Sequence, residues 1–282
     1  MFSAKTLKSK VEKAVKKLPW ETNPDSIIEL LKPAIAIKPV VVNENVASGQ
    51  SKLGGLPHLP QSIQWPGRNG IPFAFAAQIN LAEIGLNIQH PLPESGILYF
   101  FFSVNDDDYK NSLENAIHKV IYFSGDTSLL KPHDYPVNYN IAARFKECGL
   151  RFFEHYSLPA YQNYLVTEAN LSNEDENLLW EAAETICGIT GQTPDVGHQL
   201  LGNAAAVQGD VQYHWASQKG AANEKEHYNL QKEFVLLLQL DLTDAVTGFD
   251  KYGASGGIYF GLTANDLKNK QFDATVFVLQ NS

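Results

Sequence analysis

Two segments of this chain each resemble a segment about 160 residues later, and this repeat constrains the fold more than any other feature. Residues 95–106 align with residues 255–266, and six of the twelve positions are identical. Just upstream, residues 73–81 align with residues 234–242. The two offsets are 160 and 161 residues, so both matches keep one register with a single slip. Such a repeat indicates duplication of a β-rich unit.

The repeated segments favour an α+β fold made mainly of antiparallel strands, because both contain strand-length apolar runs. We expect the two units to be related by a pseudo-twofold axis, with helices at the N-terminus and in the middle. The predicted organisation is an N-terminal helical segment at 1–32, a first β-rich unit at 33–140 and a second at 141–282 with a helical insertion. No Ser-rich or Pro-rich linker separates the units, so we expect them to pack as one globular body.

Helices are predicted where apolar residues recur at helical spacing. This spacing predicts a helix over residues 7–18 that ends before Pro19. Asn23 followed by Pro24 predicts a second helix, which reaches about Leu31. Residues 160–169 favour a short helix. A capping pattern at residues 172–175 starts another, for which Gly188 is a suitable end.

Strands are predicted where β-branched and aromatic residues cluster between turn residues. They are expected over residues 34–42, 73–81, 97–104, 117–123, 150–156, 234–242, 257–262 and 275–279, and residues 197–202 open the second β unit. Residues 51–60 are predicted to be a structural loop because of Gly54, Gly55 and Pro57, and Trp65 closes it.

Composition and charge exclude several classes of protein. The net charge is −9, and the six lysines and one glutamate of residues 1–18 leave −14 on the remainder. An acidic body disfavours nucleic acid. No apolar run approaches the about 18 residues that span a bilayer, so no stable membrane insertion is expected. The N-terminus lacks the apolar block of a signal peptide, and two cysteines are too few for a disulfide framework, so we expect a cytoplasmic protein.

Two interpretations of the basic N-terminal helix are open. It could lie on an anionic membrane or meet an acidic partner, or it could dock on the acidic body of its own chain. Its apolar stripe of Leu7, Val11 and Leu18 is modest and lacks tryptophan. We therefore expect docking on the body.

Polar residues occupy matching places at the ends of the repeated strands. Gln78 and Asn80 in the first unit correspond to Gln239 and Asp241 in the second. Alternate residues of a strand face the same side, so each pair could point into a cleft shared by the two units. The alternative is that these side chains tie loops to the strand ends through hydrogen bonds.

A second polar group brackets one loop of the second unit. His198, Gln208 and Asp210 could supply a base or part of a metal site, and they complete the candidate ligand cleft. A zinc site needs three or four ligands, and no second histidine has a suitable spacing. The sequence therefore predicts no metal and no cofactor, and the alternative is a hydrogen-bonded structural histidine.

Two further motifs carry no chemistry in their context. Ser255 lies in a G-x-S-x-G string, but a nucleophile elbow needs a strand before the serine and a helix after it, whereas here a strand follows. We expect a turn or bulge that enters the strand. Residues 105–108 resemble the start of a calcium loop but lack its later glycine and glutamate.

Several short motifs also occur in the order typical of one family. They are residues 51–55 with Pro57 and Pro60, then Trp65-Pro66, residues 77–81, residues 92–101, residues 197–202, residues 208–210 and residues 237–241. In this order they resemble the YwqG-like family of bacterial proteins, from about residue 30 to the C-terminus. The resemblance implies a duplicated α+β domain of unknown biochemical function with no agreed catalytic residues. Some members sit beside secreted-toxin systems, which implies immunity roles for those members.

This sequence departs from the family's usual pattern at residues 204–206, three alanines where a proline is common. Without a catalytic constellation, the sequence favours a non-enzymatic interaction module of immunity or regulatory type, with a protein partner that it does not identify. The alternative is a small-molecule binder or an enzyme with a polar site between the two units. A polar pocket would favour the second hypothesis, and an exposed apolar patch the first.

Overall fold

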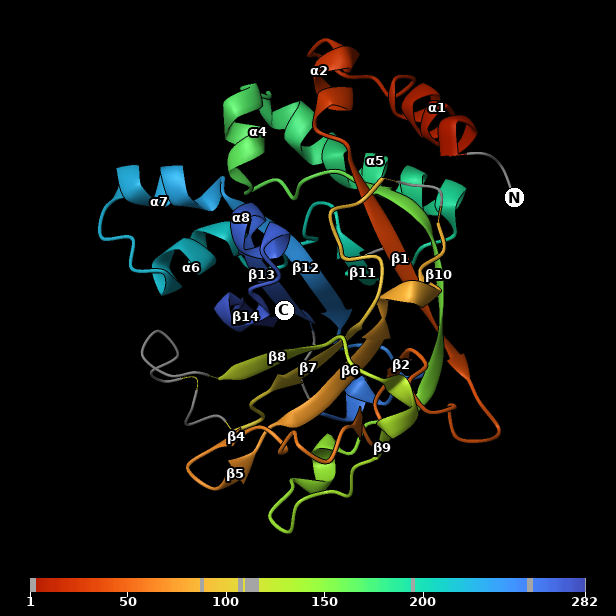
Figure 1. The fold of residues 1–282 in the computed structure, drawn as a ribbon. Helices are drawn as coiled ribbons and strands as arrows, with labels where there is room; N and C mark the ends of the chain where they lie inside the picture. The colour runs from red at the N-terminus through yellow and green to blue at the C-terminus, as the bar shows by residue number, and fades with distance from the viewer. Residues whose placement is uncertain are drawn as a thin grey trace.

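Long apolar strands form one ten-stranded antiparallel sheet at the centre of the molecule (Figure 1). The computed structural model describes residues 4–86, 89–105, 109, 117–193, 196–252 and 256–281. From one edge of the sheet to the other, the strands are β14 (Val276–Asn281), β13 (Gly256–Thr263), β12 (Phe234–Asp241), β11 (His198–Leu201), β1 (Lys32–Val41), β10 (Cys148–Ser157), β2 (Lys52–Leu53), β6 (Ala74–Asn80), β7 (Ile97–Phe102) and β8 (His118–Phe123).

Shorter elements surround this sheet, and the fold is mixed α+β as predicted. Two small two-stranded sheets pair β3 (His58–Leu59) with β9 (Lys131–Pro132) and β4 (Gly67–Arg68) with β5 (Ile71–Pro72). The α-helices of the described residues are α1 (Ala4–Val15), α2 (Pro24–Glu29), α4 (Tyr164–Ala169), α5 (Asn173–Thr190), α6 (Val211–Gln218), α7 (Glu224–Gln231) and α8 (Ala264–Lys268). Short 3₁₀ helices are η1 (Leu81–Glu83), η2 (Thr127–Leu129), η3 (Ile141–Ala143), η4 (Phe249–Tyr252) and η5 (Phe272–Ala274).

The strand order is alike when the sheet is read from either edge. One half runs β8, β7, β6, β2 and β10, and the other runs β14, β13, β12, β11 and β1. The register of β6 against β7 slips between Phe75 and Ala77, and that of β12 against β13 slips between Leu236 and Leu238. These bulges fall at positions that the sequence repeat aligns.

The halves of the sheet do not coincide with the halves of the chain. The early strand β1 pairs with β11, and the later strand β10 pairs with β2. β1 and β10 also pair with each other along their whole length, from Lys32 opposite Ser157 to Val41 opposite Cys148. Each unit of the sequence therefore gives its first strand to the other half of the sheet.

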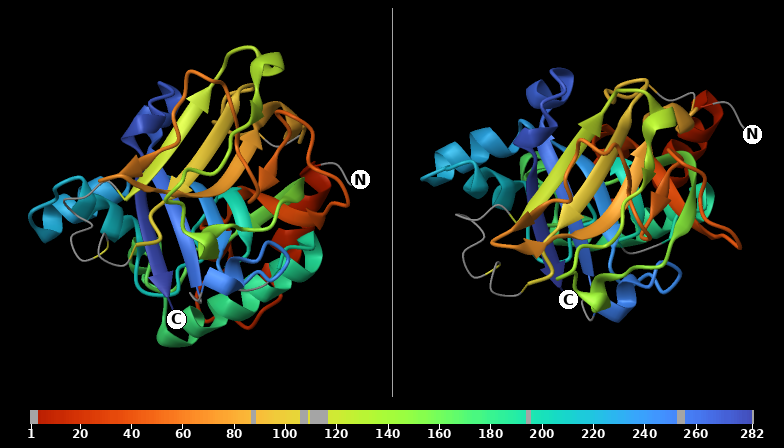
Figure 2. Two further views of the ribbon diagram at one scale, coloured as in Figure 1. Left: turned by 90° about the horizontal axis from the view of Figure 1, so that it is seen from below. Right: turned by 60° about the horizontal axis from the view of Figure 1, so that its bottom comes forward.

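The main core lies between the two halves, because the sheet folds over on itself. Figure 2 shows β6, β7 and β8 lying across β12, β13 and β14. Phe100 and Phe260 meet there with ring centroids 5.1 Å apart. The two edges also approach each other, since His118 Nε2 lies 2.9 Å from the Thr275 carbonyl oxygen. Burial of both strand faces explains why residues 97–102 are all apolar and all buried.

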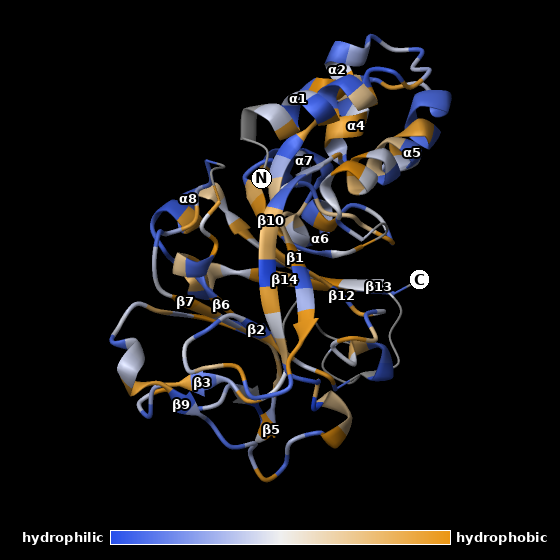
Figure 3. Cartoon of the chain, turned by 90° about the vertical axis from the view of Figure 1, so that its right-hand side faces the viewer, coloured by the Kyte–Doolittle hydropathy of each residue, from blue (hydrophilic) through white to orange (hydrophobic). Residues whose placement is uncertain are grey.

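A helical layer covers one end of the molecule (Figure 3). Val11 and Val15 of α1 are fully buried and pack with Leu179 and Ala182 of α5. Docking of the N-terminal helix on its own body, as the sequence predicts, is therefore confirmed. The Asp175 carboxylate accepts the backbone N–H groups of residues 21 and 22 at 2.8 Å each, which fixes the link between α1 and α2.

Several local predictions are confirmed and others are wrong. Asn23 caps α2 and Ser172 caps α5, as expected. α5 does not end at Gly188; it continues to Thr190, where Gly191 adopts φ +83° and donates to the Cys187 carbonyl. The predicted loop at 51–60 contains two strands, because β2 inserts between β10 and β6. The helices α6 and α7 carry weak apolar patterns and were not predicted.

Two motifs from the sequence fall partly outside the described residues. They are the stretch that contains Ser255 and the aspartates at 106–108. Gly256, which follows Ser255, begins β13 with φ +137°, and a Cβ there would lie 2.1 Å from the Gln280 carbonyl oxygen. This glycine therefore serves a close backbone approach.

Candidate functional site

Two fully buried glutamines hold loops at matching positions in the two halves. The Gln78 Oε1 atom accepts the His58 N–H at 2.8 Å, and its Nε2 donates to the Gln50 carbonyl at 2.7 Å. The Gln239 Oε1 atom accepts the Ala205 N–H at 2.9 Å, and its Nε2 donates to the Gly197 carbonyl at 3.2 Å. Both side chains are thus bonded at both ends to loop backbone.

Asn80 and Asp241 end the strands that carry these glutamines. The Asn80 Oδ1 atom accepts the Ala82 N–H at 3.1 Å, and its Nδ2 donates to the Gly49 carbonyl at 2.9 Å. The Asp241 Oδ1 atom accepts the Thr243 N–H at 2.8 Å. The polar pairs predicted from the sequence are therefore brought to strand ends, where each side chain caps the following turn.

Gln208 and Asp210 lie in the loop before α6. Asp210 caps α6 by accepting the Gln212 N–H at 2.8 Å, and burial raises the pKa of its carboxyl. Gln208 bonds to the last strand, where the Asn281 N–H donates to its Oε1 at 3.2 Å. The bonds of these two residues and those of His198 run to different partners. A ligand cleft made of all seven predicted residues remains a prediction.

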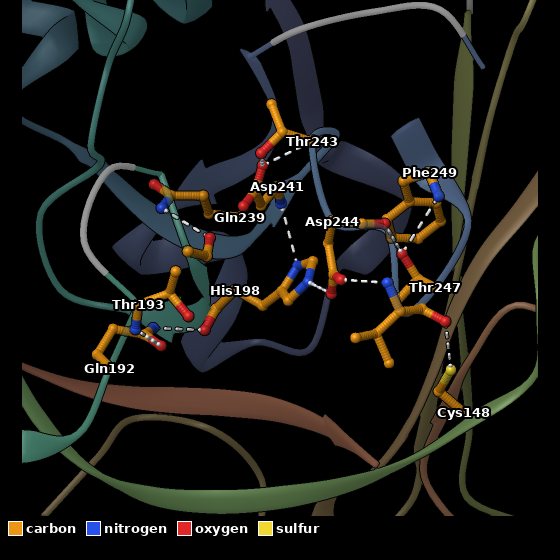
Figure 4. A network of polar contacts seen from close by, with 12 residues as sticks. Cys148, Gln192, Thr193, His198, Gln239, Asp241, Thr243, Asp244, Thr247 and Phe249 are labelled. Atoms are coloured by element: carbon orange, nitrogen blue, oxygen red, sulfur yellow. Dashed lines mark hydrogen bonds and ion pairs between the residues drawn. The ribbon is translucent and has the colours of Figure 1, made fainter. Parts of the chain in front are cut away.

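His198 instead forms a buried pair with Asp244 (Figure 4). The ring Nδ1 accepts the Asp241 N–H at 3.0 Å, which assigns the ring proton to Nε2. Nε2 then donates to Asp244 Oδ2 at 2.8 Å. Burial opposes ionisation of Asp244, but the bond and charge of His198 together with the backbone N–H groups of residues 246 and 247 outweigh it, so the pKa of this carboxyl is lowered. Both ring nitrogens therefore have partners inside the protein.

A second buried cluster joins Lys52, His58 and Glu147 in the first half. The Gly49 N–H donates to His58 Nδ1 at 3.2 Å, so the ring proton lies on Nε2, which faces Lys52 Nζ at 2.9 Å. An uncharged Lys52 amine would accept this proton, whereas the Glu147 carboxylate favours the charged form. Burial lowers the pKa of fully buried Lys52, which favours the uncharged amine, and Lys52 donates in turn to Glu147 Oε2 at 2.9 Å.

The predicted structural loop encloses this cluster. Gly54 and Gly55 adopt φ +61° and +69°, and a Cβ on Gly54 would lie 2.4 Å from the Lys146 carbonyl oxygen. The Pro57 carbonyl accepts the His133 N–H at 2.9 Å. Trp65 donates from Nε1 to the Phe73 carbonyl at 2.9 Å. The close approach to residue 146 explains why two glycines stand in sequence here.

A groove lies beside α5. Its volume is about 350 Å³, and it lies between α5 and the loops at residues 158–161 and 205–207. Three of the exposed large apolar side chains line it: Trp180 is 56% exposed, Tyr161 59% and Val207 40%. We call this surface the α5 groove. Apolar side chains that gather in this way mark interaction sites.

Two acidic side chains of α5 lie beside the apolar floor of the α5 groove. Glu176 and Glu184 line it on either side of Trp180 along the helix. The sequence of α5 contains Glu174, Asp175, Glu176, Glu181 and Glu184 and no lysine or arginine. The groove is therefore apolar at its floor and negative at its rim.

Within the described residues, no three or more His, Cys, Asp or Glu side chains gather in a way that could hold a metal ion. In the same part of the chain, no helix combines the length and the hydropathy needed to cross a bilayer.

Comparison with known proteins gives one result. Residues 51–280 match the family described as "Domain of unknown function (DUF1963)". The chain belongs to the DUF1963 family. No curated protein matches it. The DUF1963 match begins at the residue before β2 and reaches into β14, so it includes both buried clusters and the α5 groove, whereas α1, α2 and β1 precede it.

Sequence reasoning missed the roles of Lys52, Glu147 and Asp244. Lys52 was noted only within the motif at residues 51–55, Glu147 and Asp244 belong to no motif, and only the fold brings the three to their partners. Trp180 did leave a signal. It stands beside the apolar stripe of its helix rather than in it, and a tryptophan off the stripe is a candidate contact residue.

Proposed function

We propose that this protein is a non-enzymatic interaction module that binds a cationic segment of a partner protein in the α5 groove. The observation that carries the proposal is the exposed Trp180 above an apolar groove with acidic walls. Tryptophan and tyrosine dominate the binding energy of protein interfaces. They also attract Lys and Arg through the faces of their rings.

The charge of α5 selects the partner chemistry. Glu176 and Glu184 would face lysine or arginine side chains of the partner, while its apolar side chains contact the floor of the groove. An amphipathic helix or extended segment that combines Leu or Ile with Lys or Arg has this chemistry. An acidic segment would meet like charges and be rejected.

The polar clusters support a binding role because their reactive atoms have partners inside the protein. His198 uses both ring nitrogens, and Lys52 Nζ contacts both His58 and Glu147. A general base or nucleophile must be within reach of a substrate atom. The proposal of a non-enzymatic function rests on these contacts.

We further propose that the two units arose by duplication within a bacterial, cytoplasmic, YwqG-like protein of immunity or regulatory type. Matching strand orders, matching bulges and the paired glutamines support the duplication. The Tyr99 hydroxyl donates to the His58 carbonyl at 2.7 Å, and the Tyr259 hydroxyl donates to the Ala205 carbonyl at 2.7 Å. DUF1963 membership supports the family assignment.

The test uses two labelled helix-forming peptides that share one leucine face. The other face carries arginine in one peptide and glutamate in the other, and binding is followed by fluorescence anisotropy. We expect the arginine peptide alone to bind. Trp180→Ala should weaken binding at least about tenfold, as expected for a central aromatic contact. Glu176→Gln with Glu184→Gln should weaken it and reduce its salt dependence.

The matched control is Leu129→Ala, which removes a 61% exposed apolar side chain that does not line the groove. This variant should bind the arginine peptide as the unchanged protein does. Equal binding of the two peptides, or an unchanged affinity in Trp180→Ala, would contradict the proposal. Co-purification from the host then identifies the partner as a protein that the control retains and Trp180→Ala loses.

A further inference from the structure

A second cavity lies beside Trp215. Its volume is about 220 Å³, and Lys32 of β1, His90 and Trp215 of α6 are among its lining residues. The rest of the lining is largely apolar and includes Pro33, Phe234 and Leu236. One water molecule occupies about 30 Å³ in the liquid, so a single water would not fill this space.

Trp215 brings a buried donor to this cavity. The side chain is completely buried, and its Nε1 atom has no hydrogen-bond partner among the residues that the structure describes. A Cβ on Gly261 would lie 2.6 Å from Cη2 and Cζ3 of the indole, so the six-membered ring presses on β13. The pyrrole edge that carries Nε1 therefore points away from β13. Buried donors are nearly always paired, so this one indicates a bound acceptor.

The first half of the sheet shows how such a tryptophan is normally satisfied. Trp65 donates to the Phe73 carbonyl at 2.9 Å and packs against Phe101, which the sequence repeat aligns with Gly261. The same repeat aligns Phe73 with Phe234. The Phe234 carbonyl, however, accepts Gln212 Nε2 at 3.1 Å. Gln212 thus occupies the carbonyl that corresponds to the acceptor of Trp65, and the Trp215 N–H has no partner among the described residues.

Two other nitrogen-bearing side chains, His90 and Lys32, line the cavity. His90 Nδ1 is buried and also has no partner among the described residues. Lys32 is half-buried, and burial lowers the pKa of its amine while the nearby Asp210 carboxylate opposes this effect. The lining of the cavity therefore combines nitrogen-bearing side chains with apolar ones.

We propose that this cavity binds a small monocarboxylate with an apolar body. The carboxylate oxygens accept from Trp215 Nε1 and the Lys32 ammonium, and the apolar part packs on Phe234 and Leu236. A carboxylate is the ligand group that offers two acceptors and a charge to such donors. The proposal is independent of the α5 groove, which other residues line.

The experiment follows the indole N–H resonances of the full-length protein by NMR during titration with sodium benzoate and sodium hexanoate. We expect a saturable shift of the Trp215 resonance, with the Trp65 resonance unmoved because its N–H is bonded to Phe73. Benzamide and hexanamide, which have the same bodies without the charge, should bind at least about tenfold more weakly.

Two variants locate the site. Lys32→Gln should weaken benzoate binding about tenfold, and Trp215→Phe should weaken it while it keeps a six-membered ring on Gly261. Trp65→Phe is the matched control and should leave the affinity unchanged. If neither carboxylate produces a saturable shift, or if benzamide binds as tightly as benzoate, the carboxylate site is wrong.

Discussion

The two halves of the sheet share their hydrogen-bonding framework but differ in where they bury an ionisable side chain. In each half a buried glutamine and a buried tyrosine hold the same loop position, His58 in the first and Ala205 in the second. In the first half, Lys52 faces Gln78 across the strands. In the second half, the neutral Gln199 faces Gln239.

The carboxylates differ in a corresponding way. Glu147 accepts from Lys52 and from the Val46 N–H at 2.6 Å, and Asp244 accepts from His198 and from the Val246 N–H at 2.6 Å. Each half thus keeps one partly buried carboxylate that ties a loop to a nitrogen base. The comparison teaches that the hydrogen bonds shared by the two halves fix the loop backbone, whereas the nitrogen base bonded to the carboxylate is lysine in one half and histidine in the other. It can be tested by matched substitutions in the two halves.

The largest expected effect comes from Gln78→Leu and Gln239→Leu. Each change leaves at least one backbone N–H and one backbone C=O without their partner inside the protein. At about 1–3 kcal/mol for each buried group, each variant should lose about 2–6 kcal/mol of unfolding free energy. Urea unfolding measures both. A large loss in one half and none in the other would break the proposed equivalence.

Acid should destabilise the protein through histidines that are buried uncharged. Burial lowers the pKa of His58, His118 and His155 to about 4, whereas an unfolded histidine titrates near about 6.5. Between these values the unfolded chain binds more protons, so the unfolding free energy falls as the pH falls. Each histidine contributes at most about 3 kcal/mol.

Urea unfolding at several pH values between about 7 and 4 measures this loss. In His58→Gln the dependence on pH should be shallower. Ile186→Val, which trims a buried side chain that does not titrate, should shift the whole curve by about 0.5–1.5 kcal/mol without changing its slope. Parallel curves for His58→Gln and the unchanged protein would show that His58 is not buried in the uncharged form.

The next prediction concerns the charge of Lys52 and compares the loss of unfolding free energy in Glu147→Gln with that in Asp244→Asn. If Lys52 is an uncharged amine, each variant loses one hydrogen-bond acceptor and should cost a similar amount, about 1–3 kcal/mol. If Lys52 is an ammonium, Glu147→Gln leaves a buried charge and should cost about 3–5 kcal/mol. We expect the first result in urea unfolding. A Glu147→Gln loss well above that of Asp244→Asn would refute the uncharged amine.

The smallest effect is expected for Tyr99→Phe and Tyr259→Phe. Each removes one hydroxyl that donates to a loop carbonyl at 2.7 Å and keeps the buried ring. Each should lower the unfolding free energy by about 1 kcal/mol, the net value of a single hydrogen bond. Thermal unfolding of the two variants should give equal shifts, and a clear inequality would sharpen the difference between the halves.

The sequence predicted those features that depend on local patterns. Asn23 and Ser172 cap their helices, and the apolar runs became strands, because capping and strand periodicity are decided by near neighbours. The sequence did not predict elements whose structure depends on tertiary contacts. β2 is a strand because β10 and β6 flank it, although its own residues precede two glycines.

The candidate sites divide in the same way. Gln78 and Gln239 were found because they stand at repeated positions, but their bonds to residues 58 and 205 needed the fold. The cavity at Trp215 combines residues from positions 32, 90 and 215. These residues are too far apart in the chain for a sequence pattern to predict that they meet. Lys52 was part of a motif, but its base partner and its carboxylate were not.

The exchange of first strands between the halves has a consequence for how the chain can fold during its synthesis. β1 lacks both of its sheet neighbours until residues 148–157 and 198–201 have left the ribosome. β2 likewise lacks one neighbour until β10 is made. Local strand pairs such as β6 with β7 can form early, but the middle of the sheet depends on contacts that are more than one hundred residues apart. We therefore expect a nascent chain that stops before residue 148 to expose unpaired strand edges, which are the sites that holding chaperones protect from aggregation.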